Sequence, residues 1–159
     1  MSTLGKRASS YNPVGALKQR CQRVGAEWDG DDNKAERHRL QDAFGELPDC
    51  ARLMFYDAWE DIDEDVIGMS RYRAMRLFVA EWVQLMRNNL DKQYGGFLDL
   101  SQDPAAAQLD WDNIEGDYEF IVTLTPFLEE HCAKEEMTFA WWLPTRSQWY
   151  WFVTNTRYS

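Results

Sequence analysis

The chain has 159 residues, 45% of them hydrophobic and 14% aromatic, so it can form one domain with a real core and lacks the composition of a disordered protein. Its 17 basic and 27 acidic residues give a formal net charge of -10, which argues against direct binding to duplex nucleic acid. No apolar run is long enough to span a membrane, and the cysteines have neither disulfide nor zinc spacing. We therefore expect a cytoplasmic protein without membrane contact, metal or other cofactor.

The N-terminal region is basic. Residues 1–25 hold five basic side chains and no acidic one. Residues 1–13 are polar and end at a proline, which predicts a flexible basic arm, and residues 14–159 are predicted to form a single domain. Apolar residues at helical spacing then predict a short helix that ends at Gly25.

Two of the following helices have clear caps in the sequence. Asp32 or Asn33 is expected to cap a helix that stops at Gly45. Ser70 is expected to cap a longer helix, in which apolar residues recur every three or four positions up to Gly95. Four arginines make this longer helix basic, so it can lie beside the acidic helix that precedes it as a partner within the chain.

An acidic helix is predicted between these two. Pro48 and Asp49 favour its start, because proline is tolerated in the first turn and an acid suits the positive end of the helix dipole. Further acids crowd its C-terminal end, where they oppose the dipole. We therefore expect either that the helix frays near Asp61 or that these acids serve another purpose.

The C-terminal third is predicted to form a β-α-β-β unit. Apolar and polar residues alternate over residues 118–125, which predicts a strand, and Thr125 followed by Pro126 is typical of a helix start. Residues 137–143 and 148–154 are β-prone and aromatic, and the segment between them predicts a hairpin. The expected fold class is α+β, with about four N-terminal helices packed against a small antiparallel C-terminal sheet.

The sequence contains no convincing catalytic or metal-binding pattern. The segment from Asp61 begins like a calcium loop, but Val66 and Tyr72 stand where glycine and a bidentate glutamate are required. His131 and Cys132 are adjacent, so on a helix they would point about 100° apart and could not form a nucleophile and base pair. A small enzyme whose site is assembled only in three dimensions is kept as an alternative.

Most of the acidic residues lie in two segments, and a solvated surface is the plainest explanation for them. Residues 42–65 contain nine acids and one base, and residues 99–119 contain seven acids and no base. Carboxylates spaced along a helix and a loop can imitate the phosphates of nucleic acid, and tryptophans among them can anchor a partner. The residues that we expect to bind a partner are Asp57, Trp59, Glu60, Asp61, Asp63, Glu64, Asp65, Asp110, Trp111, Asp112, Glu115 and Asp117.

These two segments lead to a hypothesis about function. A non-enzymatic acidic protein could bind and inhibit a basic protein or nucleic-acid-handling complex, as nucleic-acid mimics of the anti-restriction or anti-CRISPR kind do. An immunity protein that neutralises a cationic toxin would use the same kind of surface, and it is the second alternative.

Overall fold

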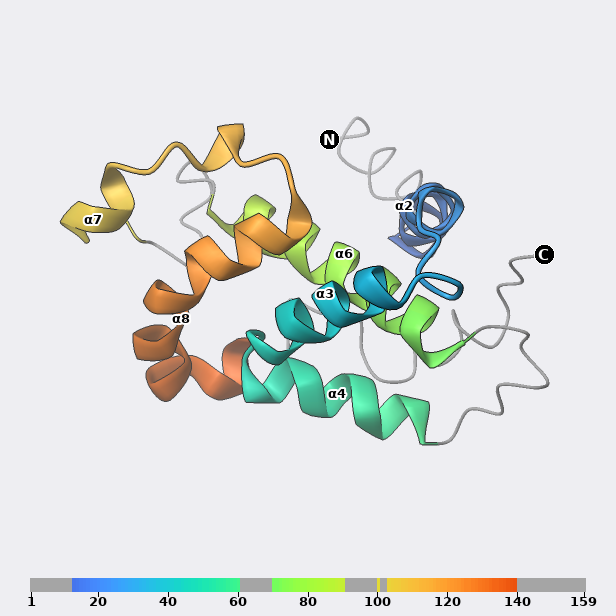
Figure 1. The fold of residues 1–159 in the computed structure, drawn as a ribbon. Coiled ribbons are helices and arrows are strands. Elements are labelled where there is room, and N and C mark those ends of the chain that lie inside the picture. The colour runs from blue at the N-terminus through green and yellow to red at the C-terminus, as the bar shows by residue number, and fades with distance from the viewer. Residues whose placement is uncertain (1–12, 61–69, 91–99, 101–102, 140–159) are drawn as a thin grey trace, which may run out of the picture.

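The computed structural model describes residues 13–60, 70–90, 100 and 103–139, and regular structure within that part of the chain is entirely helical (Figure 1). The α+β prediction is therefore wrong for the described residues. The elements in chain order are α2 (Pro13–Glu27), α3 (Lys34–Gly45), α4 (Asp49–Trp59), α6 (Arg71–Asn89), α7 (Pro104–Ala107), the 3-10 helix η2 (Trp111–Asn113) and α8 (Asp117–Phe139).

The predicted caps of α3 and α6 are confirmed. The side chain of Asn33 accepts a hydrogen bond from the backbone N–H of Glu36 at 3.2 Å, and Ser70 Oγ accepts one from Arg73 N–H at 3.1 Å. α3 also ends at Gly45, as predicted. The prediction for α2 is wrong at its C-terminal end, because the helix continues past Gly25 to Glu27.

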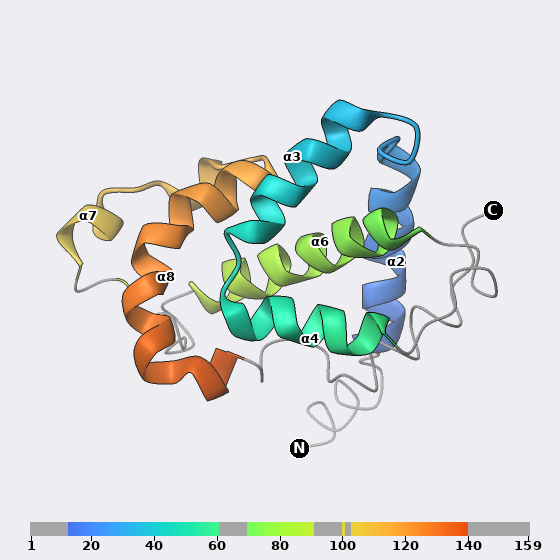
Figure 2. The same ribbon diagram turned by 60° about the horizontal axis from the view of Figure 1, so that its bottom comes forward.

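α6 is the central helix of the fold. It contacts α2, α3, α4 and α8, and Figure 2 shows it crossing the middle of the molecule between them. Large side chains are fully buried along it, among them Leu77, Phe78, Trp82 and Met86. A helix that buries several of its faces in this way is surrounded by other elements, so the rest of the fold is assembled on α6.

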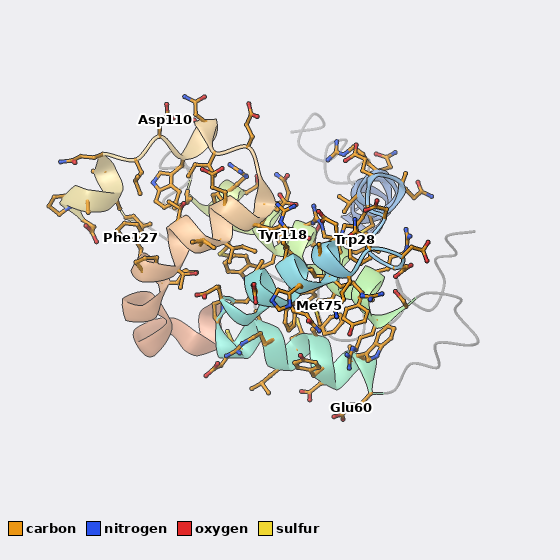
Figure 3. All side chains as sticks on the ribbon, in the orientation of Figure 1. Trp28, Glu60, Met75, Asp110, Tyr118 and Phe127 are labelled. Atoms are coloured by element: carbon orange, nitrogen blue, oxygen red, sulfur yellow. The ribbon has the colours of Figure 1, made fainter. Side chains whose placement is uncertain are left out.

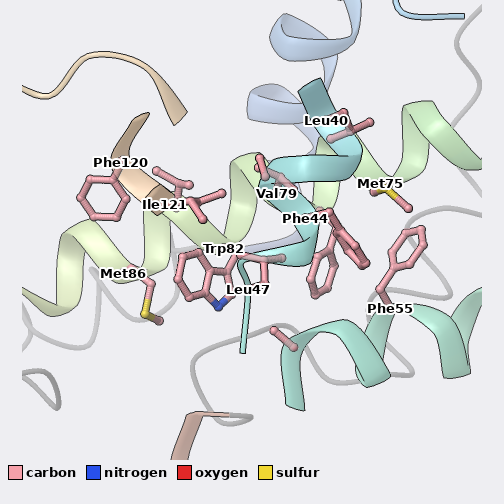
Figure 4. Close-up of a cluster of buried hydrophobic side chains, with 14 of the residues drawn as sticks. Leu40, Phe44, Leu47, Phe55, Met75, Val79, Trp82, Met86, Phe120 and Ile121 are labelled. Atoms are coloured by element: carbon pink, nitrogen blue, oxygen red, sulfur yellow. The ribbon is translucent and has the colours of Figure 1, made fainter. Parts of the chain in front are cut away.

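Aromatic rings join α3, α4 and α6 at one end of this core (Figure 4). The ring of Phe55 lies edge-to-face against Phe44 at 5.4 Å and against Phe78 at 5.6 Å between ring centres. The ring of Trp59 stacks on that of Phe55, with 6.0 Å between ring centres and an interplanar angle of 7°. Each such pair adds about 0.5–1.5 kcal/mol beyond the burial of its area, so α4 is held firmly by its inner face.

The strand predicted over residues 118–125 is wrong, because these residues form the first part of α8. The buried side chains there are Phe120, Ile121, Leu124 and Leu128, which is the spacing of one helical face. Pro126 lies inside this helix and does not start it.

The proline has a local effect on α8. Proline has no N–H to donate to the preceding turn, and such a position bends a helix; Figure 2 shows α8 changing direction along its length. Thr125 Oγ1 is within donating distance of two carbonyl oxygens, that of Ile121 at 2.7 Å and that of Glu46, in the turn between α3 and α4, at 3.2 Å. Of the other predicted strands, residues 137–139 belong to α8, whereas 140–143 and 148–154 lie outside the described residues.

α6 lies against α4, and three of its arginines bind groups outside α4. Arg73 binds the carboxylate of Asp31 at 3.2 Å and the carbonyl oxygen of Gly25 at 2.6 Å. Arg76 pairs with Asp117 at 2.9 Å, and Arg87 reaches the loop before α8. Three arginines of α6 therefore bind groups near the C-terminal end of α2 and the N-terminal end of α8.

Candidate partner-binding surface

The loop that joins α7 to α8 is held to α6 by one arginine. Arg87 Nη1 donates to the carbonyl oxygen of Trp111 at 3.0 Å, and its Nη2 donates to that of Ile114. The guanidinium also lies 4.3 Å from the centre of the Phe120 ring. Because the guanidinium is planar and rigid, two bonds from it fix both the position and the orientation of this backbone.

Trp111 also anchors this loop. Its indole N–H donates to the carbonyl oxygen of Ala106 at 3.2 Å. Its ring lies edge-to-face against Phe120 at 5.9 Å and against Phe127 at 5.8 Å. Trp111 was expected to touch a partner, and the structure places it half-buried against the core, where it supports the loop from beneath.

The acids of this loop differ in exposure. Asp110, Asp112 and Glu115 are exposed, and Figure 3 shows Asp110 at the outer edge of the molecule. Asp117 is half-buried and paired with Arg76. We call residues 110–117 the acidic loop; it presents three exposed carboxylates on a backbone that the half-buried side chains of Arg87 and Trp111 hold in place.

The second predicted segment is described only in part. Asp57 and Glu60 are exposed at the C-terminal end of α4, and Trp59 between them is half-buried on Phe55. The remaining four members of the segment lie outside the described residues: Asp61, Asp63, Glu64 and Asp65.

The two segments do not form one face in the part of the chain that the structure describes. Figure 3 shows Glu60 and Asp110 far apart, at opposite ends of the molecule. A partner that touched both would have to span the width of the domain. Each segment is therefore treated as a separate surface.

Tyr118, directly behind the acidic loop, is a residue that the sequence analysis assigned to a strand. The guanidinium groups of Arg39 and Arg76 lie 5.6 and 5.2 Å from the centre of its ring. Burial raises the pKa of its phenol above the ordinary value, and the positive charge of Arg76 opposes that effect. The phenol therefore stays protonated at neutral pH, and its role here is packing between α3, α6 and α8. No local pattern in the sequence relates Tyr118 to these arginines.

Residues 13–60, 70–90, 100 and 103–139 contain neither a metal-binding cluster nor a helix that could span a membrane. No three His, Cys, Asp or Glu side chains in that part of the chain lie close enough together to hold a metal ion. The described helices also include none with the length and hydropathy needed to cross a membrane.

The chain has no match among family models, curated proteins or solved structures. Any functional assignment must therefore come from its own surfaces.

Proposed function

We propose that this protein is a non-enzymatic acidic binding protein that inhibits a basic, nucleic-acid-handling partner, in the manner of a nucleic-acid mimic. The observation that supports this proposal most strongly is the acidic loop. Asp110, Asp112 and Glu115 are exposed there, on a backbone fastened by Arg87 and Trp111.

The fixed backbone matters because it separates a recognition surface from ordinary solvated charge. Ordering a loop on binding costs free energy, and a loop already held in shape avoids most of that cost. An acidic surface that only promotes solubility gains nothing from half-buried anchors such as Arg87 and Trp111. The construction of the loop is therefore what a partner-binding surface needs.

The charge around the loop points to a cationic partner. Residues 99–119 contain no basic side chain, and the nearest arginines of α6 face inward, where Arg76 pairs with Asp117 and Arg87 binds carbonyl oxygens. The outward field is consequently negative. Such a field raises the rate of association with a positively charged groove by roughly 10 to 1,000-fold, and it does so less at high salt.

The test is an affinity capture from the native host at low salt, followed by mass spectrometry and elution in a salt gradient. One variant reverses the charge of the three exposed acids of the acidic loop: Asp110→Lys, Asp112→Lys and Glu115→Lys. A matched control makes the same change in net charge at three exposed acids between the end of α2 and the start of α3: Glu27→Lys, Asp29→Lys and Asp32→Lys.

We expect the native protein and the control to capture the same basic nucleic-acid-binding protein, and the loop variant to lose it. Purified, that partner should release labelled nucleic acid when the native protein is added. Equal capture by the loop variant would contradict the assignment of the loop. A captured cationic toxin with no nucleic-acid-binding activity would make the protein an immunity protein instead.

A further inference from the structure

A second arginine of α6 holds the end of the acidic loop. Arg76 Nη2 lies 2.9 Å from a carboxylate oxygen of Asp117, which is the last residue of the loop and the first of α8. The Arg76 guanidinium also lies 5.2 Å from the centre of the Tyr118 ring, as that of Arg87 lies 4.3 Å from the centre of the Phe120 ring. Each arginine therefore combines a polar bond to the loop with a contact to an aromatic ring of α8.

The two arginines lie on one side of α6. They are eleven residues apart, which in a regular α-helix is three full turns and about 20°, or about 16 Å along the axis. Arg87 binds the carbonyl oxygens of Trp111 and Ile114, so the loop is held both near its start and at its end. Because both contacts come from one regular helix, the spacing between the held points of the loop is fixed.

The ion pair of Arg76 and Asp117 is poorly explained as a device for stability alone. Its side chains are only 17% and 24% exposed, so both charges lose much of their hydration. Arg76 Nη1 is enclosed as well, and the part of the chain that the structure describes offers it no hydrogen-bond acceptor. Enclosed ion pairs often add little net stability because desolvation offsets the attraction, and an unpaired donor adds a further cost. What the pair does provide is a fixed position for the end of the loop.

We propose that Arg76, acting through Asp117, is a positioning residue for the acidic loop, and that the loop recognises its partner by the spacing of its three exposed carboxylates as well as by their charge. This inference rests on the proposed function, because it concerns the same surface. The partner then presents fixed cations, as a folded nucleic-acid-binding groove does. A flexible polycation can adapt to any arrangement of acids, so the shape of the loop discriminates between these two kinds of ligand.

Arg76→Gln tests the inference, because charge and shape predict opposite results. The change makes the protein more acidic, so a surface that acts by charge alone should bind a cationic ligand equally well or better. A surface that also acts by shape should lose affinity for a rigid partner when the end of the loop is released. Arg71→Gln is the matched control, since it makes the same charge change at an exposed position at the start of the same helix.

Two ligands are compared, the basic partner captured from the native host and then purified, and a fluorescently labelled oligolysine. We expect Arg76→Gln to weaken binding of the partner about tenfold, mainly through faster dissociation, and Arg71→Gln not to weaken it. Both variants should bind oligolysine at least as tightly as the native protein does. Undiminished binding of the partner by a folded Arg76→Gln variant would overturn the inference.

Asp117→Asn provides a second test in case Arg76→Gln does not fold. It breaks the same ion pair from the other side, and Asp112→Asn removes one exposed carboxylate as its charge-matched control. We expect Asp117→Asn to raise the rate of dissociation from the partner and leave the association rate unchanged. Asp112→Asn should instead lower the association rate and its sensitivity to salt. The same kinetic change in both variants would place Asp117 in the recognition surface itself and contradict its positioning role.

The two proposals fail in different ways. If the native protein captures no basic nucleic-acid-handling partner, the proposed function fails and this inference fails with it. If the native protein captures such a partner and Arg76→Gln binds it equally well, the inference fails alone.

Discussion

The acidic loop and the C-terminal end of α4 carry the same signal in the sequence, acids around a tryptophan, yet they are built differently. In the loop, Arg87 and Trp111 hold an irregular backbone from beneath, so that its shape depends on a few specific bonds. At the end of α4, a regular helix is held by one buried ring, Phe55, on which Trp59 stacks. Both tryptophans serve as supports, and the sequence shows where the charge lies without showing how firmly it is held.

Phe55→Ala should have the largest effect on stability, and the loss of amide protection should be confined to α4. The ring is fully buried among Phe44, Trp59 and Phe78, so its removal is expected to lower the free energy of unfolding by about 3–5 kcal/mol in urea denaturation. Amide exchange should quicken in α4 and stay slow in the acidic loop at low denaturant.

The control on the same helix is Leu53→Ala, which removes an exposed side chain and should change stability by about 0.5 kcal/mol or less. Phe55→Leu offers a milder replacement if the alanine variant does not fold. Equal loss of protection in α4 and in the loop would mean that the two regions form one cooperative unit.

Arg87→Met should have the next largest effect on stability, and that effect should be confined to the acidic loop. Methionine keeps the apolar stem but leaves the carbonyl oxygens of Trp111 and Ile114 without their charged donor, at an expected cost of about 2–3 kcal/mol. Exchange should quicken at residues 110–117 and not in α4. Arg87→Lys should restore only part of the stability, because an ammonium lacks the planar pair of donors. A full recovery with lysine would show that charge alone holds the loop.

The helix starts could be predicted because their causes are local. The caps at Asn33 and Ser70 act on a backbone N–H three residues further along the chain, so one short stretch of sequence contains both partners. The helical structure of the first part of α8 could not be predicted in this way. Its first residues are apolar at positions 118, 120, 121, 122 and 124, a pattern that fits both an alternating strand and one helical face. Packing of Phe120 and Ile121 against α6 decides between them, and that is a tertiary effect.

The candidate surface could likewise be predicted only in part from the sequence. Counting charges was enough to find the exposed acids of the loop. The group that shapes the loop, Arg87, lies 24 and 27 residues away from the carbonyl oxygens that it binds, and no periodic pattern connects them. The separation of the two acidic segments likewise depends on how α4 and α8 pack, which the sequence does not record.

Tyr118, which follows the acidic loop in the chain, should make a smaller, pH-dependent contribution to the free energy of unfolding. Burial raises the pKa of its phenol in the folded protein, so the folded state keeps the proton to higher pH than the unfolded chain does. Its contribution to stability is fully present below the ordinary tyrosine pKa of about 10 and is lost as pH rises through the higher folded value. Urea denaturation at neutral and alkaline pH should show a larger loss for the native protein than for Tyr118→Phe. Parallel losses would contradict this role for Tyr118.

The smallest expected effect bears most directly on why α4 ends in acids. Glu60→Lys places a cation at the negative end of the helix dipole and should stabilise the protein by about 0.3–1 kcal/mol, with Glu60→Gln in between. Asp112→Lys makes the same charge change in the acidic loop and should alter stability by no more than about 0.5 kcal/mol in either direction. Matched urea denaturation at low salt measures both. A stabilising Glu60→Lys would show that the native acid opposes folding at this position. A destabilising Glu60→Lys would show that the native acid already makes a favourable interaction in the folded protein.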